Sequence, residues 1–207
     1  MIVTKIEACT KTKFKIYLDG VFAFVLYKGE LARFSISEGV DVPEETVEKI
    51  RVEVIAKRAR MRAMHLLEDM DRTEAALREK LKQGLYPQDA VDGAVAYVKS
   101  FGYLNDSRYA ENFVRSRMGT KSRKEIQAAL LKKGITPEQI NEAFDVCCED
   151  GETDAEEDAI RNILRKKRFD PEEADEAGIQ KMLAYLGRKG FRYDTVRHVI
   201  QNYKMNA

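Results

Sequence analysis

Residues 102–135 read GYLNDSRYAENFVRSRMGTKSRKEIQAALLKKGI, and this stretch is the most informative part of the chain about its fold. Its apolar residues recur every three or four positions, which is the period of amphipathic helices. Ser122 and Glu125 have the spacing of a capping box, and Gly134 stands where the second apolar stripe stops. The stretch therefore predicts two consecutive amphipathic helices, the second of which ends at a glycine.

The same arrangement recurs on both sides of this stretch. Gly84, Gly134 and Gly190 each follow an apolar stripe and precede an apolar residue, at separations of 50 and 56 residues. A further predicted helix precedes each glycine-ended helix, at residues 51–70, 106–118 and 154–168. The stripes that lead into the glycines contain Leu77 with Leu81, Ile126 with Leu130, and Leu183 with Leu186. Because repeats of this length bury apolar surface against their neighbours, we predict three tandem three-helix repeats in an elongated, curved array.

Helix starts and core residues follow from the same patterns. Thr136-Pro137-Glu138-Gln139 and Asp170-Pro171-Glu172-Glu173 both have the composition of a helix start. The last helix of each repeat has an apolar face, and Met61, Met64 and Met70 are interpreted as core residues of the first repeat. The three faces comprise Val91, Ala94, Val95 and Val98; Ile140, Ala143, Phe144 and Cys147; and Val196, Val199, Ile200 and Tyr203.

The first fifty residues have a different period. Residues 13–18 alternate between apolar and polar, Asp19-Gly20 is a tight-turn dipeptide, and residues 21–27 form an apolar strand pattern, so we predict a β-hairpin. Residues 2–8 favour a third strand, and residues 28–34 favour a short helix. The chain is therefore predicted to be mainly α. Its predicted parts are a β-rich extension at 1–42 and helical repeats at 43–105, 106–150 and 151–207.

Composition narrows the class of protein. Charged residues make up 34% of the chain, and the longest apolar runs are too short to cross a bilayer. The chain opens without a secretory signal pattern, so we expect a cytoplasmic protein. Cys147 and Cys148 are adjacent, and His65 and His198 stand alone, which is atypical of a zinc site or a catalytic cluster. We expect no enzymatic activity, no metal and no cofactor.

Charge is distributed in blocks, although the net charge of the whole chain is only +1. Within residues 115–133 seven basic residues face a single acid, Glu125, whereas residues 138–158 contain ten acids and no base. Helix dipoles and solvated helix faces explain part of this pattern, but we favour a functional basic surface. Tyr109 and Phe113, four residues apart, are interpreted as core residues in preference to a base-stacking platform.

The central stretch resembles the signature region of the RecX family, regulatory proteins that bind filaments of the RecA recombinase. The resemblance covers about residues 51–204 and is strongest in the middle repeat. Asn105 departs from it, since the family usually has an acid there. The resemblance rests on Gly102, Tyr103, Leu104, Asp106, Arg108, Tyr109, Ala110, Phe113, Val114, Arg117, Ile126, Leu130, Lys133, Gly134 and Ile135.

The resemblance implies a regulator without catalytic activity that lies in the groove of the RecA filament and suppresses its ATPase and strand-exchange activities. It implies neither a membrane nor a small-molecule substrate as partner, and it leaves contact with DNA within or beside the filament open. The rival interpretation is a protein that binds single- or double-stranded DNA directly and independently of RecA. The predicted partner-binding residues are Arg115, Arg117, Lys121, Arg123, Lys124, Lys132 and Lys133.

Overall fold

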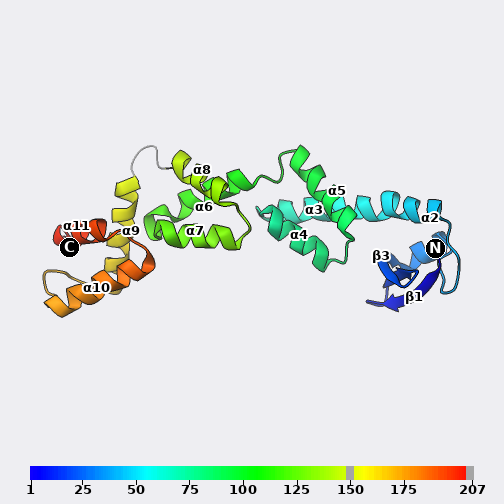
Figure 1. Cartoon of the computed structure of the whole chain (residues 1–207), viewed down its shortest axis with the longest axis horizontal. Coiled ribbons are helices and arrows are strands. Elements are labelled where there is room, and N and C mark those ends of the chain that lie inside the picture. The colour runs from blue at the N-terminus through cyan, green and yellow to red at the C-terminus, as the bar shows by residue number, and fades with distance from the viewer. Residues whose placement is uncertain (148–151, 204–207) are drawn as a thin grey trace. The chain divides into compact units, whose positions relative to one another are not determined.

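The computed structural model describes residues 1–147 and 152–203 (Figure 1). The chain forms two compact units, Met1–Asn105 and Asp106–Ala207. Helices predominate in both, which confirms the prediction of a mainly α protein. Three positions of the sequence analysis lie outside the described residues: Cys148, and Glu149 and Asp150 of the acidic block.

A three-stranded antiparallel sheet opens the first unit. Its strands, β1 (Val3–Ala8), β2 (Lys13–Leu18) and β3 (Val21–Tyr27), pair in chain order. Asp19 and Gly20 connect β2 to β3 with φ angles of 48° and 83°, the left-handed conformation that a two-residue hairpin turn requires. The short helix α1 (Lys28–Arg33) follows directly. The predicted hairpin, third strand and short helix are all confirmed.

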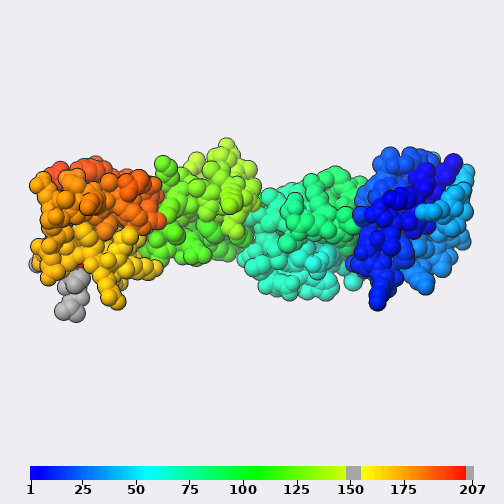
Figure 2. Space-filling view, turned by 90° about the horizontal axis from the view of Figure 1, so that it is seen from below, coloured from blue at the N-terminus to red at the C-terminus, as the bar shows by residue number. Residues whose placement is uncertain are grey.

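The sheet shares its core with the first helical repeat. A continuous helical segment runs through α2 (Glu44–Lys49), the π-helical η1 (Ile50–Ala56) and α3 (Lys57–Asp69). Ile16, Phe24 and Leu26 of the sheet belong to the same buried cluster as Ile50 and Ile55. Figure 2 shows the side chains of the sheet and of the first repeat in contact, so these two parts fold as one body.

Two helices, α4 (Glu74–Gln83) and α5 (Gln88–Ser100), complete the first repeat. The methionine prediction is partly wrong here: Met61 and Met70 are exposed by 53% and 56%, and only Met64 packs against the core. Met61 lies two residues from Ala59 and therefore on another face of α3, while Met70 stands after the helix end in extended backbone.

The second unit contains two further repeats, each with its own apolar cluster. The second repeat consists of α6 (Asp106–Arg117), the 3-10 turn η2 (Met118–Thr120), α7 (Arg123–Lys132) and α8 (Pro137–Cys147). The third consists of α9 (Glu152–Lys167), α10 (Glu176–Lys189) and α11 (Tyr193–Gln201). The prediction of three three-helix repeats is thereby confirmed.

The structure corrects the start of α10. Asp170-Pro171 was predicted to begin a helix, but the carboxylate of Asp170 accepts the N–H of Glu172 at 2.9 Å in a turn. The helix begins at Glu176, where Asp175 accepts the N–H of Gly178 at 2.8 Å as its cap. The residue that occupies the stripe position predicted for Leu183 is Met182, which is buried, whereas Leu183 is only partly buried.

The ends of the middle helices share one motif, but its register differs in the first repeat. The N–H groups of Ile135 and Phe191 bond to the carbonyls of Leu130 and Leu186, around left-handed glycines. In the first repeat the N–H of Tyr86 bonds to Leu81, and Leu85, with φ of 61°, takes the left-handed position. Gly84 is not left-handed, so the predicted glycine alignment is one residue out in this repeat.

The end of α9 uses the same motif without a glycine. The N–H of Phe169 bonds to the carbonyl of Leu164 at 3.0 Å, and the exposed Arg168 is left-handed with φ of 51°. A side chain in this conformation strains the backbone by roughly 1–2 kcal/mol. A glycine there would remove this strain, but it would lose more conformational entropy on folding, which offsets part of the gain.

We predict that Arg168→Gly raises the free energy of unfolding by about 0.5–1 kcal/mol, because it relieves this strain without removing a buried side chain. Urea unfolding followed by circular dichroism measures the change. The control is Lys166→Gly, two residues earlier in right-handed helix, which lowers stability by about 1 kcal/mol. Equal destabilisation by both variants would contradict the prediction.

Candidate interaction surface

Five of the seven predicted partner-binding residues lie at the two ends of α7, a ten-residue helix about 15 Å long, and two lie in the last turn of α6. Lys121, Arg123 and Lys124 stand at its start, and we name them the α7 start group. The other four residues lie at the end of α7 and in the last turn of α6. These exposed residues are Arg115, Arg117, Lys132 and Lys133.

Two of these four cations, Lys133 and Arg117, lie beside a pair of aromatic rings. Tyr109 and Phe113 are half-buried, pack against the core of the repeat and stack with ring centroids 6.3 Å apart. Lys133 Nζ lies 5.6 and 5.8 Å from the two ring centroids, and the Arg117 guanidinium lies 5.8 Å from that of Phe113. The rings thus belong to the edge of the core, and they hold cations by cation–π contact.

At the start of α7, Ser122 joins the second repeat to the third. Its buried hydroxyl accepts the N–H of Glu125 at 3.1 Å and donates to the carbonyl oxygen of Lys189, the last residue of α10, at 2.6 Å. The Glu125 carboxylate completes the predicted capping box by accepting the N–H of Ser122 at 3.4 Å. One serine therefore caps α7 and ties it to the carboxyl end of α10.

Glu125 adds an ion pair to this joint. Its carboxylate lies 2.9 Å from Lys189 Nζ and 3.7 Å from Lys121 Nζ. Burial alone would raise the pKa of Glu125, but the hydrogen bonds from Lys189 and from the Ser122 N–H outweigh it, so the pKa lies below its usual value of 4.5. The same hydrogen bond raises the pKa of Lys189.

Close backbone approach completes the joint between these repeats. Asn162 of α9 donates to the carbonyl oxygen of Gly119 at 2.8 Å. Gly190 is left-handed at φ of 92°, and a Cβ added there would lie 2.6 Å from the Cβ of Lys124. A side chain at Gly190 is therefore excluded by contact with Lys124 as well as by its own backbone conformation.

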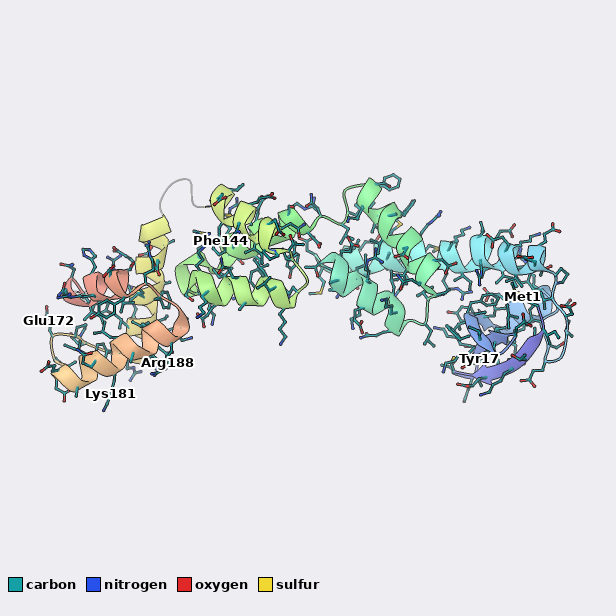
Figure 3. All side chains as sticks on the ribbon, viewed as in Figure 1. Met1, Tyr17, Phe144, Glu172, Lys181 and Arg188 are labelled. Atoms are coloured by element: carbon teal, nitrogen blue, oxygen red, sulfur yellow. The ribbon has the colours of Figure 1, made fainter. Side chains whose placement is uncertain are left out.

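A cleft of about 410 Å³ lies beside this joint. All three members of the α7 start group line it, together with Glu156 of α9 and Arg192 beyond α10. The Arg123 guanidinium lies 4.4 Å from the ring centroid of Phe144, which is labelled on α8 in Figure 3. Cations at the amino end of a helix oppose its dipole, so the stability of α7 does not explain the α7 start group.

The third repeat brings further residues to this place that were not predicted from the sequence. Lys189 and Arg192 flank the glycine stop at Gly190, and Arg192 pairs with Glu156 at 2.8 Å. Lys189 stands 56 residues after Lys133, so the repeat period could have placed it at a helix end. Its contact with Ser122 depends on how the repeats pack, which the period does not report.

The isolated histidines each lie near one carboxylate: His65 is 3.2 Å from Glu68, and His198 is 3.8 Å from Glu157. Over residues 1–147 and 152–203, no group of three or more His, Cys, Asp or Glu side chains is placed to hold a metal ion. In the same part of the chain, the helices are too short or too polar to cross a membrane.

Three three-helix repeats, the second and third of which meet at a joint lined by cations, define a helical-repeat protein. Family models for the first, second and third three-helix domains of RecX match residues 59–97, 105–143 and 154–200. The chain belongs to the RecX family of regulatory proteins.

Relatives of known name and structure match nearly all of the chain. The regulatory protein RecX of Caldanaerobacter subterraneus is 30% identical over 97% of this chain and 98% of its own. The regulatory protein RecX of Clostridioides difficile is 28% identical over 96% of this chain and 94% of its own. A crystal structure of regulatory protein RecX, 25% identical, superposes with a TM-score of 0.63 over 98% of this chain and 99% of its own.

We predict that Glu125→Gln lowers the free energy of unfolding by about 1 kcal/mol at pH 7, because it removes a charge-assisted hydrogen bond. The depressed pKa makes this stabilisation fully present above pH 4.5, and it is lost as the pH falls through the lower folded-state value. Urea unfolding of both proteins at pH 7 and pH 3 measures it. A difference that persists unchanged at pH 3 would contradict the prediction.

We predict that Gly190→Ala destabilises the second unit by roughly 2–4 kcal/mol, the sum of left-handed strain and of overpacking against Lys124. The matched control is Gly102→Ala, which has the left-handed strain alone: φ is +71°, and an added Cβ meets no described atom within 4 Å. The control should cost about 1–2 kcal/mol. If thermal unfolding shows equal losses of stability for both variants, the close approach of Gly190 to Lys124 does not contribute to the cost.

Proposed function

We propose that this protein binds filaments of the RecA recombinase and inhibits their ATPase and strand-exchange activities, without being an enzyme itself. Membership of the RecX family supports the regulatory role. The observation that carries the proposal is the α7 start group, three cations placed against the dipole of their own helix. Such an arrangement favours an acidic partner, since binding recovers the electrostatic cost.

In this proposal the partner-binding surface contains the cations at the two ends of α7 and those in the last turn of α6. The α7 start group meets an acidic or DNA-bearing surface of the filament, and Arg115, Arg117, Lys132 and Lys133 extend the contact. The joint through Ser122 and Glu125 holds the third repeat beside the second, so that α9 and α10 can reach a neighbouring protomer of the filament.

Reversal of the α7 start group, as Lys121→Glu, Arg123→Glu and Lys124→Glu together, is predicted to abolish inhibition of the DNA-dependent ATPase of RecA. The helix should persist, because acids at its amino end agree with its dipole. The matched control reverses three exposed lysines of the first unit, Lys11, Lys28 and Lys49, with the same change in charge. The measurement is ATPase titration, with circular dichroism as the check on folding.

If the reversed protein inhibits as well as the parent, the α7 start group is not the docking surface. Co-sedimentation with RecA filaments and with naked single-stranded DNA separates the two partners. The rival, direct DNA binding independent of RecA, predicts sedimentation with naked DNA that falls steeply with salt and is lost in the same variant. The proposal predicts retention by the filament and little retention by naked DNA.

A further inference from the structure

The cleft at the joint has a floor of a different character from its rim. Met118, Ile126, Phe144 and Ala155 contribute apolar side chains to it, and Ile126 and Phe144 are each only 2% exposed. They come from three elements, η2, α7 and α8, together with α9 of the next repeat. The floor is thus an opening into the edge of the apolar core, and an apolar group placed there is removed from water.

The rim is cationic. Four cations line it, namely Lys121, Arg123, Lys124 and Arg192. Two carboxylates oppose them: Glu125, which lies 3.7 Å from Lys121 Nζ, and Glu156, which lines the cleft itself. The Glu156 carboxylate is already engaged, because it accepts the N–H of Arg192 at 3.0 Å, the Arg192 Nε at 2.8 Å and the Thr195 hydroxyl at 3.2 Å. The rim therefore has an excess of positive charge and attracts carboxylates or phosphates.

The floor decides between these two kinds of anion. Single-stranded nucleic acid binds by stacking its bases on exposed aromatic faces. Phe144, the aromatic residue of the floor, is already covered by the Arg123 guanidinium at 4.4 Å, and Met118, Ile126 and Ala155 are aliphatic. An aliphatic floor below a cationic rim matches a bulky apolar side chain with acidic neighbours, because the guanidinium and ammonium groups bind carboxylates.

We propose that this cleft binds an acidic peptide segment of the partner protein, with one large apolar side chain on the floor and flanking carboxylates on Lys121, Arg123 and Lys124. The inference rests on the proposed function in that the segment belongs to the protein that docks on the α7 start group. It adds the chemistry of recognition: acidic residues bring the segment to the rim, and the apolar side chain fixes its register.

The chain contains no tryptophan, so a tryptophan in a probe peptide reports on its own surroundings. The probe is the peptide Asp-Glu-Trp-Glu-Asp with blocked ends, titrated with the full-length protein at low salt. Its emission should shift to the blue and saturate as the indole enters the cleft. The same peptide with alanine in place of tryptophan should compete at least tenfold less well, because the floor then contributes little.

Two variants fill the cleft from two different helices while leaving its cations in place: Ala155→Phe on α9 and Gln127→Phe on α7. Each variant should lower the affinity for the probe peptide about tenfold or more. The matched control is Ala128→Phe, which introduces the same phenylalanine at the next position of α7. Ala128 is exposed and does not line the cleft, so this variant should bind the peptide as the parent does. Circular dichroism checks that all three variants fold.

Unchanged binding by both cleft-filling variants would overturn the inference. So would an oligodeoxythymidylate that displaces the peptide and loses its own affinity in those variants, since the cleft would then be a nucleic-acid site. The ATPase titration separates the two proposals. If the cleft-filling variants still inhibit RecA but the charge reversal does not, the peptide site is wrong and the proposed function stands. If the peptide binds as expected but charge reversal leaves inhibition intact, the proposed function is wrong.

Discussion

The hydrogen bond from the buried hydroxyl of Ser122 to the carbonyl oxygen of Lys189 is the interaction on which the arrangement of the second unit depends. It joins the amino end of α7, the positive end of that helix dipole, to the carboxyl end of α10, the negative end of its own dipole. Gly190 makes this possible, because any side chain there would collide with Lys124.

That joint also explains why cations are tolerated at the start of α7. Taken alone, the helix would be destabilised by Lys121, Arg123 and Lys124 at its positive end. In the structure the carboxyl end of α10 lies beside them and Glu125 is held between Lys121 and Lys189, so part of the repulsion is offset. The charge that remains is directed at the cleft, and the packing of two repeats thus concentrates positive potential at one place.

Local patterns predicted the elements well, and tertiary contacts set the limit. The hairpin at Asp19-Gly20 and the capping box at Ser122 depend only on residues near in sequence, and both are as expected. The alignment of the first repeat was wrong by one residue because a glycine was taken to mark the left-handed position, which Leu85 occupies. In the candidate site, the cations of α7 could be predicted because they lie close together in the sequence. Lys189, which bonds to Ser122 and Glu125, could not be predicted there, because it arrives by the packing of another repeat.

The two compact units hold their parts together by different means, and this bears on function. The sheet and the first repeat share one apolar cluster, and Arg58 of α3 strengthens their contact by bonding the carbonyl oxygen of Val25 at 3.0 Å. The second and third repeats have separate apolar clusters, and polar bonds through Ser122, Glu125 and Asn162 connect them. A shared core loses buried area at once when its parts separate, whereas a polar joint exchanges its bonds with water at smaller net cost. A partner seated in the cleft would contact α7 and α9 together, so its binding free energy would add to that of the joint and favour the packed arrangement of the two repeats.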